Sequence, residues 1–361
     1  MSRHVPGHVS ALTGLRGIAV GLVVAAHAHI DHLSAGLFGV DVFFVLSGYL
    51  ITGVLLGLAP FDGRRWGMFL GRRAARLLPA LAVTLVALAG WALIIGDAGT
   101  CLALAATHTM DLPLGSASQC PGPFHITWSL AAEEQFYLLW PVLVVLLSRL
   151  PARLAAAWCF AGYVGLWALA EVVTLVTPSA AEWWNYFPTG RPSALLLGSG
   201  LAFVLPLRGQ GRRLPESVTR IAVPALLVGL VVTGVLLELP SGPRQVLLGP
   251  LVAVPTTLLI AALVSVPGHS LGRSRLLVWL GEVSYCLYLV HVLALHLVRR
   301  VQGDDELITN SIGVGVALLG AWALHRWVEQ PVRTLGYAWL NRREAVHNAR
   351  AEALRTPTLV G

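Results

Sequence analysis

Two ionisable residues on one apolar stretch near the amino terminus are the first candidates for chemistry. Arg16 and His27 lie eleven residues apart. That spacing is about three helical turns, so both side chains project from one face, about 16 Å apart along the axis. Burial favours the uncharged imidazole, which can accept a proton from a hydroxyl group. We therefore expect a cation near one end of this helix and a general base near the other.

Two carboxylates are predicted to lie at the depth of His27. Asp41 begins the next apolar stretch, and Glu133 lies in the first half of a later one. Glu133 is preferred over its neighbour Glu134 because Ser129 and Tyr137 share its helical face. We expect Asp41 and Glu133 to orient or charge-stabilise His27, in the manner of a triad without a serine nucleophile.

A third polar group follows near the carboxyl-terminal third of the chain. Ser284, Tyr288 and His291 are spaced i, i+4 and i+7, so they share one helical face. Such a face would also be explained by interhelical hydrogen bonding alone. We assign these three residues to substrate binding, together with Tyr137 and Arg191.

A basic group is predicted at the depth of Arg16. Arg72, Arg73 and Arg76 precede or enter an apolar stretch. Guanidinium groups bind phosphate with a planar, bidentate fork, so this group suits the phosphates of a coenzyme A thioester. The separation of Arg16 from His27 resembles the reach of a pantetheine arm. The alternative is that these arginines only anchor a helix at the membrane surface.

The stretches that carry these residues indicate a membrane protein. Of 361 residues, 56% are hydrophobic and 12% charged, where soluble domains carry roughly a quarter charged residues. A bilayer requires about 20 apolar residues for each helical span. The predicted fold is all-α, with about ten transmembrane helices near residues 11–31, 36–57, 76–96, 126–148, 154–176, 191–206, 220–237, 246–265, 276–298 and 309–328.

The distribution of charge predicts the topology. All 25 basic residues are arginines, and most fall in alternate connections that share a side with both termini. The positive-inside rule then places both termini in the cytoplasm, which requires an even number of spans. This explains the net charge of +7 without a nucleic-acid partner. We expect a membrane domain over residues 1–338 and a short cytoplasmic polar tail, poorly ordered, over 339–361.

The cysteines and the aromatic residues give two further expectations. Cys101 and Cys120 share one loop without arginine and are candidates for a disulfide, the alternative being two free thiols. No His/Cys spacing suits zinc, so no metal is expected. Arg191 follows a cluster of aromatic residues that could stack on a sugar or form an interfacial belt; the cluster comprises Trp183, Trp184 and Tyr186.

The motifs resemble those of the acyltransferase 3 family from Leu12 to Pro331. The matching segments are Leu15-Arg16-Gly17 with His27, the run from Gly39 to Tyr49, Arg72-Arg73 with Arg76 and Pro79, the run from Trp128 to Tyr137, Arg191 with Leu197-Gly198, Ser284-Tyr285 with Tyr288-Leu289 and His291, and Glu329-Gln330-Pro331. Their order and number make the resemblance specific.

This resemblance implies an O-acyltransferase with ten membrane helices. It would move an acyl group, often acetyl, from acyl-CoA to a hydroxyl of a sugar, lipid-linked glycan or secondary metabolite. Arg16 and His27 would be essential, and the basic motif would serve the donor. We expect a multi-pass protein of a bacterial plasma membrane, whose partners are membrane lipid, acyl-CoA and the hydroxylated acceptor.

The sequence leaves alternatives for the role of His27 and for the class of function. His27 could act as general base or could itself be transiently acylated. A transporter or exporter of an acylated or glycosylated product would also carry charges inside the membrane. A purely structural membrane subunit is the third alternative.

Overall fold

The described part of the chain consists of helices joined by short turns. The computed structural model describes residues 10–30, 34–58, 62–96, 99–112, 120, 122–177, 190–205, 216–238, 244–265, 270–302 and 306–353, and within them no strand occurs. The predicted all-α fold is confirmed. The aromatic residues 183, 184 and 186 lie outside the described residues.

The helices follow the predicted spans in order. They are α1 (Ser10–His27), α2 (Gly39–Gly57), α3 (Gly63–Ile95), α4 (Gly99–Ala106), α5 (Thr127–Leu147), α6 (Ala152–Val176), α8 (Ala194–Val204), α9 (Glu216–Glu238), α10 (Arg244–Ser265), α11 (Arg275–Gln302), α12 (Glu306–Leu324) and α13 (Gln330–Ala353). Short 3₁₀ turns precede four of them, namely η1 (Ser34–Phe38), η4 (Gly122–Phe124), η6 (Arg191–Ser193) and η7 (Ser270–Gly272).

Eight segments among the described residues are long and apolar enough to cross a membrane. Two shorter apolar helices, Arg191–Val204 and Arg220–Leu236, coincide with the sixth and seventh predicted spans. Large apolar side chains point outward, with Leu93 86% exposed and Val86 74% exposed. A water-soluble surface would not carry so many exposed Leu and Val side chains, whereas lipid solvates them. The fold is that of a polytopic membrane protein, and ten spans with cytoplasmic termini stay predictions.

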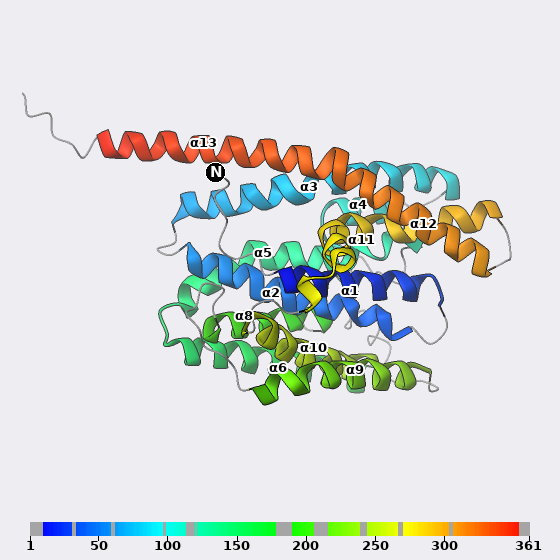
Figure 1. The fold of residues 1–361 in the computed structure, drawn as a ribbon, viewed down its shortest axis with the longest axis horizontal. Helices are drawn as coiled ribbons and strands as arrows, with labels where there is room; N and C mark the ends of the chain where they lie inside the picture. The colour runs from blue at the N-terminus through cyan, green and yellow to red at the C-terminus, as the bar shows by residue number, and fades with distance from the viewer. Residues whose placement is uncertain are drawn as a thin grey trace, which may run out of the picture.

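The arrangement of the bundle places the predicted site near its middle. In Figure 1, α3 and α13 lie along one side, α6 and α9 along the opposite side, and α1 and α2 between them. α1 packs against α11, α2 against α8, and α3 against α13. The helices that carry Arg16, Arg72 and Ser284 therefore enclose a common interior.

Small residues allow the central helices to approach closely. A Cβ atom at Gly281 of α11 would overlap the backbone carbonyl oxygen of Thr13 on α1. A Cβ atom at Gly198 of α8 would likewise overlap the carbonyl oxygen of Val45 on α2. Without a hydrophobic force between helices in lipid, such close backbone contacts supply van der Waals attraction. These crossings fix the position of α1 and α2 in the core.

Two helices extend beyond the predicted span boundaries. α3 begins at Gly63, because Asp62 caps it by accepting from the backbone N–H of Arg65 at 2.8 Å. The arginines of the basic motif are therefore on its first turns, not in a loop. α13 continues through the predicted boundary at residue 338 as far as Ala353, so the expectation of a poorly ordered tail was wrong over that part. Leu340 of α13 packs at Gly71 of α3, which gives the polar helix a partner.

The predicted disulfide is confirmed. Cys101 at the start of α4 is bonded to Cys120, 19 residues further on. The bond ties α4 to the segment that leads into η4 and α5. Closing a loop of this length is worth about 3 kcal/mol by reducing the entropy of the unfolded chain. The other two cysteines, Cys159 and Cys286, are free and buried.

Candidate functional site

A cavity of about 530 Å³, lined by both polar and apolar side chains, opens among α1, α2, α3, α5, α11 and α13. All four residues proposed from the sequence for donor binding border it. Its charged and hydroxyl-bearing lining residues are Arg16, Ser47, Arg72, Arg73, Arg76, Ser129, Glu133, Tyr137, Ser284, Tyr285, Tyr288 and Tyr337. The cavity therefore joins a basic group from α1 and α3 to hydroxyl groups from α2, α5, α11 and α13.

Arg16 and Arg73 are held by hydroxyl and aromatic side chains, whereas Arg72 donates to Asn341 and pairs with Glu344. Nη2 of Arg16 donates to Oγ of Ser284 at 2.9 Å. The guanidinium of Arg73 lies 3.2 Å from the ring centroid of Tyr137, a cation–π contact. The Nε atoms of Arg73 and Arg76 are buried, and neither has a hydrogen-bond partner within the described residues. A buried donor without a partner is costly, so these two atoms call for an acceptor that a ligand can supply.

Among the described residues, the one carboxylate that borders the cavity comes from α5. Glu133 accepts from Oγ of Ser47 at 2.8 Å and from Oη of Tyr137 at 2.6 Å. Glu133 and Tyr137 therefore share one face of α5, as the helical period predicts. Glu133 lies beside the arginine group, and its hydrogen bonds go to Ser47 and Tyr137, not to His27.

α1 and α11 run side by side in the same direction. Arg16 contacts Ser284 near one end, and Nδ1 of His27 lies 3.4 Å from Nε2 of His291 near the other. The close crossing at Gly281 sets this register. Two residues of the face predicted on α11, Ser284 and His291, therefore contact the two residues predicted on α1.

His27 lies outside the cavity lining and is connected to it through α11. The Tyr288 ring, which borders the cavity, lies 5.6 Å from the His291 ring, and the His27 and His291 ring centroids are 4.9 Å apart. Oη of Tyr288 is 2.7 Å from Oγ of Ser129. A path of polar side chains thus leads from the cavity to the histidine pair.

Asp41 and Arg191 form a buried ion pair. Nε of Arg191 donates to Oδ2 of Asp41 at 3.0 Å, and its Nη2 donates to the same oxygen and to the carbonyl oxygen of Leu37. The Asp41 carboxylate is 1% exposed. The guanidinium also lies over the ring of Phe38 at 4.5 Å. The structure therefore brings Asp41 to Arg191, and neither residue borders the cavity.

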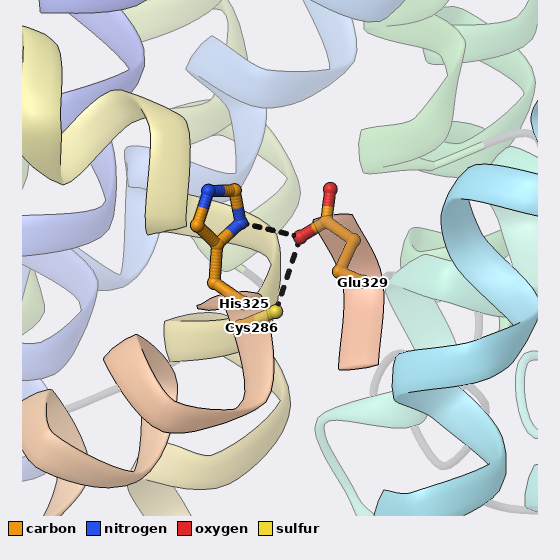
Figure 2. A group of neighbouring side chains, drawn as sticks. All are labelled: Cys286, His325 and Glu329. Carbon is orange, nitrogen blue, oxygen red and sulfur yellow. Dashed lines mark hydrogen bonds and ion pairs between the residues drawn. The ribbon is translucent and has the colours of Figure 1, made fainter. Parts of the chain in front are cut away.

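A second polar cluster lies beside the cavity, where the chain passes from α12 to α13. His325–Glu329 forms one π-helical turn, η8, and Cys286 of α11 faces it (Figure 2). Oε2 of Glu329 accepts from Nδ1 of His325 at 2.8 Å and from Sγ of Cys286 at 3.2 Å. Nε2 of Gln330 donates to Nε2 of His325 at 2.9 Å. The three ligand-type atoms lie within 4.8 Å of one another, and these hydrogen bonds engage all of them.

The comparison with known families decides the affiliation of the chain. The model of an acyltransferase domain, acyltransferase 3, matches residues 9–326. The chain belongs to the acyltransferase 3 family. The resemblance inferred from the motifs is confirmed.

Two curated relatives cover almost the whole chain. It is 32% identical, over 96% of its length, to a Bacillus subtilis protein named "Putative peptidoglycan O-acetyltransferase YrhL". It is 28% identical, over 93% of its length, to the peptidoglycan O-acetyltransferase OatA of Listeria monocytogenes. The chain spans 57% of the length of each of these relatives. No solved structure matches the chain.

Several residues of this cavity were not singled out from the sequence. Ser47 lies within the motif that runs from Gly39 to Tyr49, and its place on the Asp41-containing helix could have suggested it. Tyr285 donates to the carbonyl oxygen of Leu77 at 3.0 Å and follows Ser284 directly. Tyr337 comes from α13, and nothing in the local sequence indicates that this helix returns to the cavity.

Proposed function

We propose that this protein is a membrane-embedded O-acyltransferase that moves an acyl group, acetyl in the first instance, from acyl-CoA to a hydroxyl group of a cell-envelope glycan. The observation that carries the proposal is the arginine-lined cavity within a chain of the acyltransferase 3 family. The names of the relatives make peptidoglycan the first acceptor to test. The setting would be the plasma membrane of a bacterium.

The donor would bind through the basic half of the cavity. Arg16, Arg72, Arg73 and Arg76 would receive the phosphates of coenzyme A, and the unpartnered Nε atoms of Arg73 and Arg76 support this role. Arginine binds phosphate with two parallel N–H groups, which gives both affinity and orientation. Ser284 would keep Arg16 in position.

His27 would act as the general base on the acceptor. It would take the proton of the hydroxyl group while the hydroxyl oxygen attacks the thioester carbonyl carbon. The carbon–sulfur bond would then break, and the coenzyme A sulfur would leave with the proton. Since His27 lies beyond the cavity lining, the acyl arm would extend past Tyr288 toward the histidine pair. A transiently acylated His27 would use the same position.

Glu133 and Asp41 would support the site through residues other than His27, the partner expected from the sequence. Glu133 would hold the hydroxyl groups of Ser47 and Tyr137 and offset the charge of the arginines. Asp41 would act by holding Arg191 at the start of η6. Both assignments follow the hydrogen bonds that these carboxylates make.

Reconstituted protein provides the direct test. Proteoliposomes would receive radiolabelled acetyl-CoA with soluble peptidoglycan fragments, and transfer to the fragments would be measured. We expect transfer by the wild type and by Arg149→Gln, whose exposed arginine lies outside the cavity. We expect no measurable transfer by His27→Gln. Wild-type rates in His27→Gln would refute the assignment of the base.

The same assay separates the transporter alternative. A transporter of an acylated product would leave the thioester intact and would move labelled product across the bilayer. A structural subunit would tolerate Arg16→Gln and His27→Gln without a change in either measurement.

A further inference from the structure

A hydrogen bond to the backbone fixes which nitrogen of His27 carries the proton. Nδ1 of His27 lies 2.9 Å from the carbonyl oxygen of Val23, one helical turn earlier. A carbonyl oxygen can only accept, so Nδ1 of His27 must be the protonated nitrogen. In a neutral imidazole the other nitrogen then has a free lone pair. Nε2 of His27 is therefore the basic atom.

His291 carries its own proton in the same way. Its Nδ1 lies 2.8 Å from the carbonyl oxygen of Tyr288 and 3.2 Å from that of Leu287. Nδ1 of His291 is accordingly protonated, and its Nε2 is an acceptor. That acceptor lies 3.4 Å from Nδ1 of His27. The proton on Nδ1 of His27 is thus shared between the Val23 carbonyl oxygen and Nε2 of His291.

We propose that His291 is a positioning residue for His27: it holds the imidazole in the tautomer and orientation that present Nε2 as the base. This inference rests on the proposed function of His27. A hydrogen-bond acceptor on the far nitrogen is what a triad carboxylate supplies to its histidine. Here a neutral, fully buried histidine supplies it.

The surrounding structure supports this assignment. Asp41 of α2, which was predicted to orient His27, is paired with Arg191 instead. The end of α1 is also fixed, because Nη2 of Arg299 donates to the carbonyl oxygen of His27 at 3.1 Å. Both histidines come from helices that pack against each other, α1 and α11.

In the reaction, one proton passes from the acceptor hydroxyl through Nε2 of His27 to the coenzyme A sulfur. Nε2 of His27 takes the proton of the acceptor hydroxyl and becomes part of an imidazolium. Nδ1–H of His27 keeps its two acceptors, and the positive charge strengthens both hydrogen bonds. When the coenzyme A sulfur leaves, Nε2 returns the proton to it. His291 remains neutral throughout.

The test combines steady-state kinetics with the ¹⁵N NMR spectrum of the His27 ring. The full chain in nanodiscs would be labelled with ring-¹⁵N histidine, and the His27 signals would be assigned by their loss in His27→Gln. The variants would be His291→Leu, which has no acceptor, and His291→Gln, which keeps an acceptor oxygen. His108→Asn is the matched control, because His108 lies in a loop and has a positive φ of 53° that asparagine accepts.

We expect the wild type to show a protonated Nδ1 and a bare Nε2 on His27. In His291→Leu, kcat should fall about 10 to 100-fold with little change in the KM for acetyl-CoA, as for other groups that orient a functional histidine. A second His27 tautomer should appear in its spectrum. His291→Gln should recover part of the kcat, and His108→Asn should match the wild type.

Two results would overturn the inference. One is a wild-type spectrum with the proton on Nε2 of His27. The other is a folded His291→Leu with wild-type kcat and an unchanged His27 spectrum, while His27→Gln is inactive. Full activity of His27→Gln would instead overturn the proposed function of His27 itself.

Discussion

Arg76 lies at the cavity with a guanidinium that the protein leaves incompletely paired. Its Nε atom is buried without a partner among the described residues. We expect Arg76→Gln to raise the KM for acetyl-CoA about 10 to 100-fold, because a hydrogen bond to a charged group is worth about 1.5–3 kcal/mol. Arg76→Lys should recover only part, since an ammonium lacks the planar fork. Initial rates against donor concentration would measure this, with Arg149→Gln as control. An unchanged KM in Arg76→Gln would exclude donor contact at this position.

Asp41 and Arg191 make a different prediction, on stability. Removing one partner of a buried ion pair leaves an uncompensated charge, which costs about 3–5 kcal/mol. Asp41→Ala should therefore lower the Tm in detergent strongly, and the double variant Asp41→Leu, Arg191→Met should recover much of the loss. If Asp41 acted mainly on His27, Asp41→Asn would instead lower kcat at an unchanged Tm.

The sequence predicts which residues of the site share a face when those residues lie on the same helix. Arg16 with His27, and Ser284 with His291, share faces because the helical period fixes them. The partners across helices follow from no local rule. Asp41 lies 150 residues from Arg191, and a guanidinium with a full charge and several N–H donors is a stronger partner for a carboxylate than a neutral imidazole.

At the scale of elements, the crossing of α1 and α11 sets the register of both functional pairs. A methyl group at Gly281 would overlap the carbonyl oxygen of Thr13. We expect Gly281→Ala to destabilise the protein by about 1–3 kcal/mol, as overpacking does, and to lower kcat by displacing Ser284 from Arg16. Thermal unfolding and transfer rates would test both effects. Gly315→Ala on α12 is the control, because a methyl group there meets open space. Equal stability of the two variants would contradict the close crossing.

The elements differ from the sequence expectation where polar residues form helices. Hydropathy detects only the part of a helix that is apolar, so α3 was predicted to begin at residue 76 and the last helix to end at 328. The arginines before residue 76 and the polar residues after 329 are still good helix formers. They are stabilised by each other, since Nη2 of Arg72 donates to Oδ1 of Asn341 at 3.0 Å and pairs with Glu344. A contact between helices so far apart in the chain is not visible in a window of hydropathy.

At the scale of the whole molecule, a short cap outside the candidate spans joins the bundle of long helices. Residues 99–112 include α4, which the disulfide joins to Cys120. Gln135 of α5 fastens this cap by donating to Oδ1 of Asp111 at 2.8 Å and to the carbonyl oxygen of His108 at 3.0 Å. The cap lies outside the candidate spans, so its ionisable groups can respond to the pH of the surrounding water.

Asp111 should make the stability of the protein depend on pH. The side chain is 2% exposed, and burial raises its pKa from 3.8 to about 6. Between about pH 4 and pH 6 the unfolded chain loses this proton while the folded chain retains it. The folded state then binds more protons, so the free energy of unfolding falls as the pH rises through that window, by at most about 3 kcal/mol. Below pH 4 and above pH 6 this contribution is constant.

Asp111→Asn isolates that contribution, because the amide is neutral and keeps an oxygen for Gln135 to donate to. Thermal unfolding in detergent between pH 4 and pH 7 should show a Tm that declines in the wild type and declines less in the variant. Above pH 6 the variant should be the more stable of the two, since it buries no charge. The difference between the two curves cancels the other groups that titrate in the same range. Parallel curves would mean that the Asp111 carboxylate is hydrated, and that the cap is more open than its hydrogen bonds to Gln135 indicate.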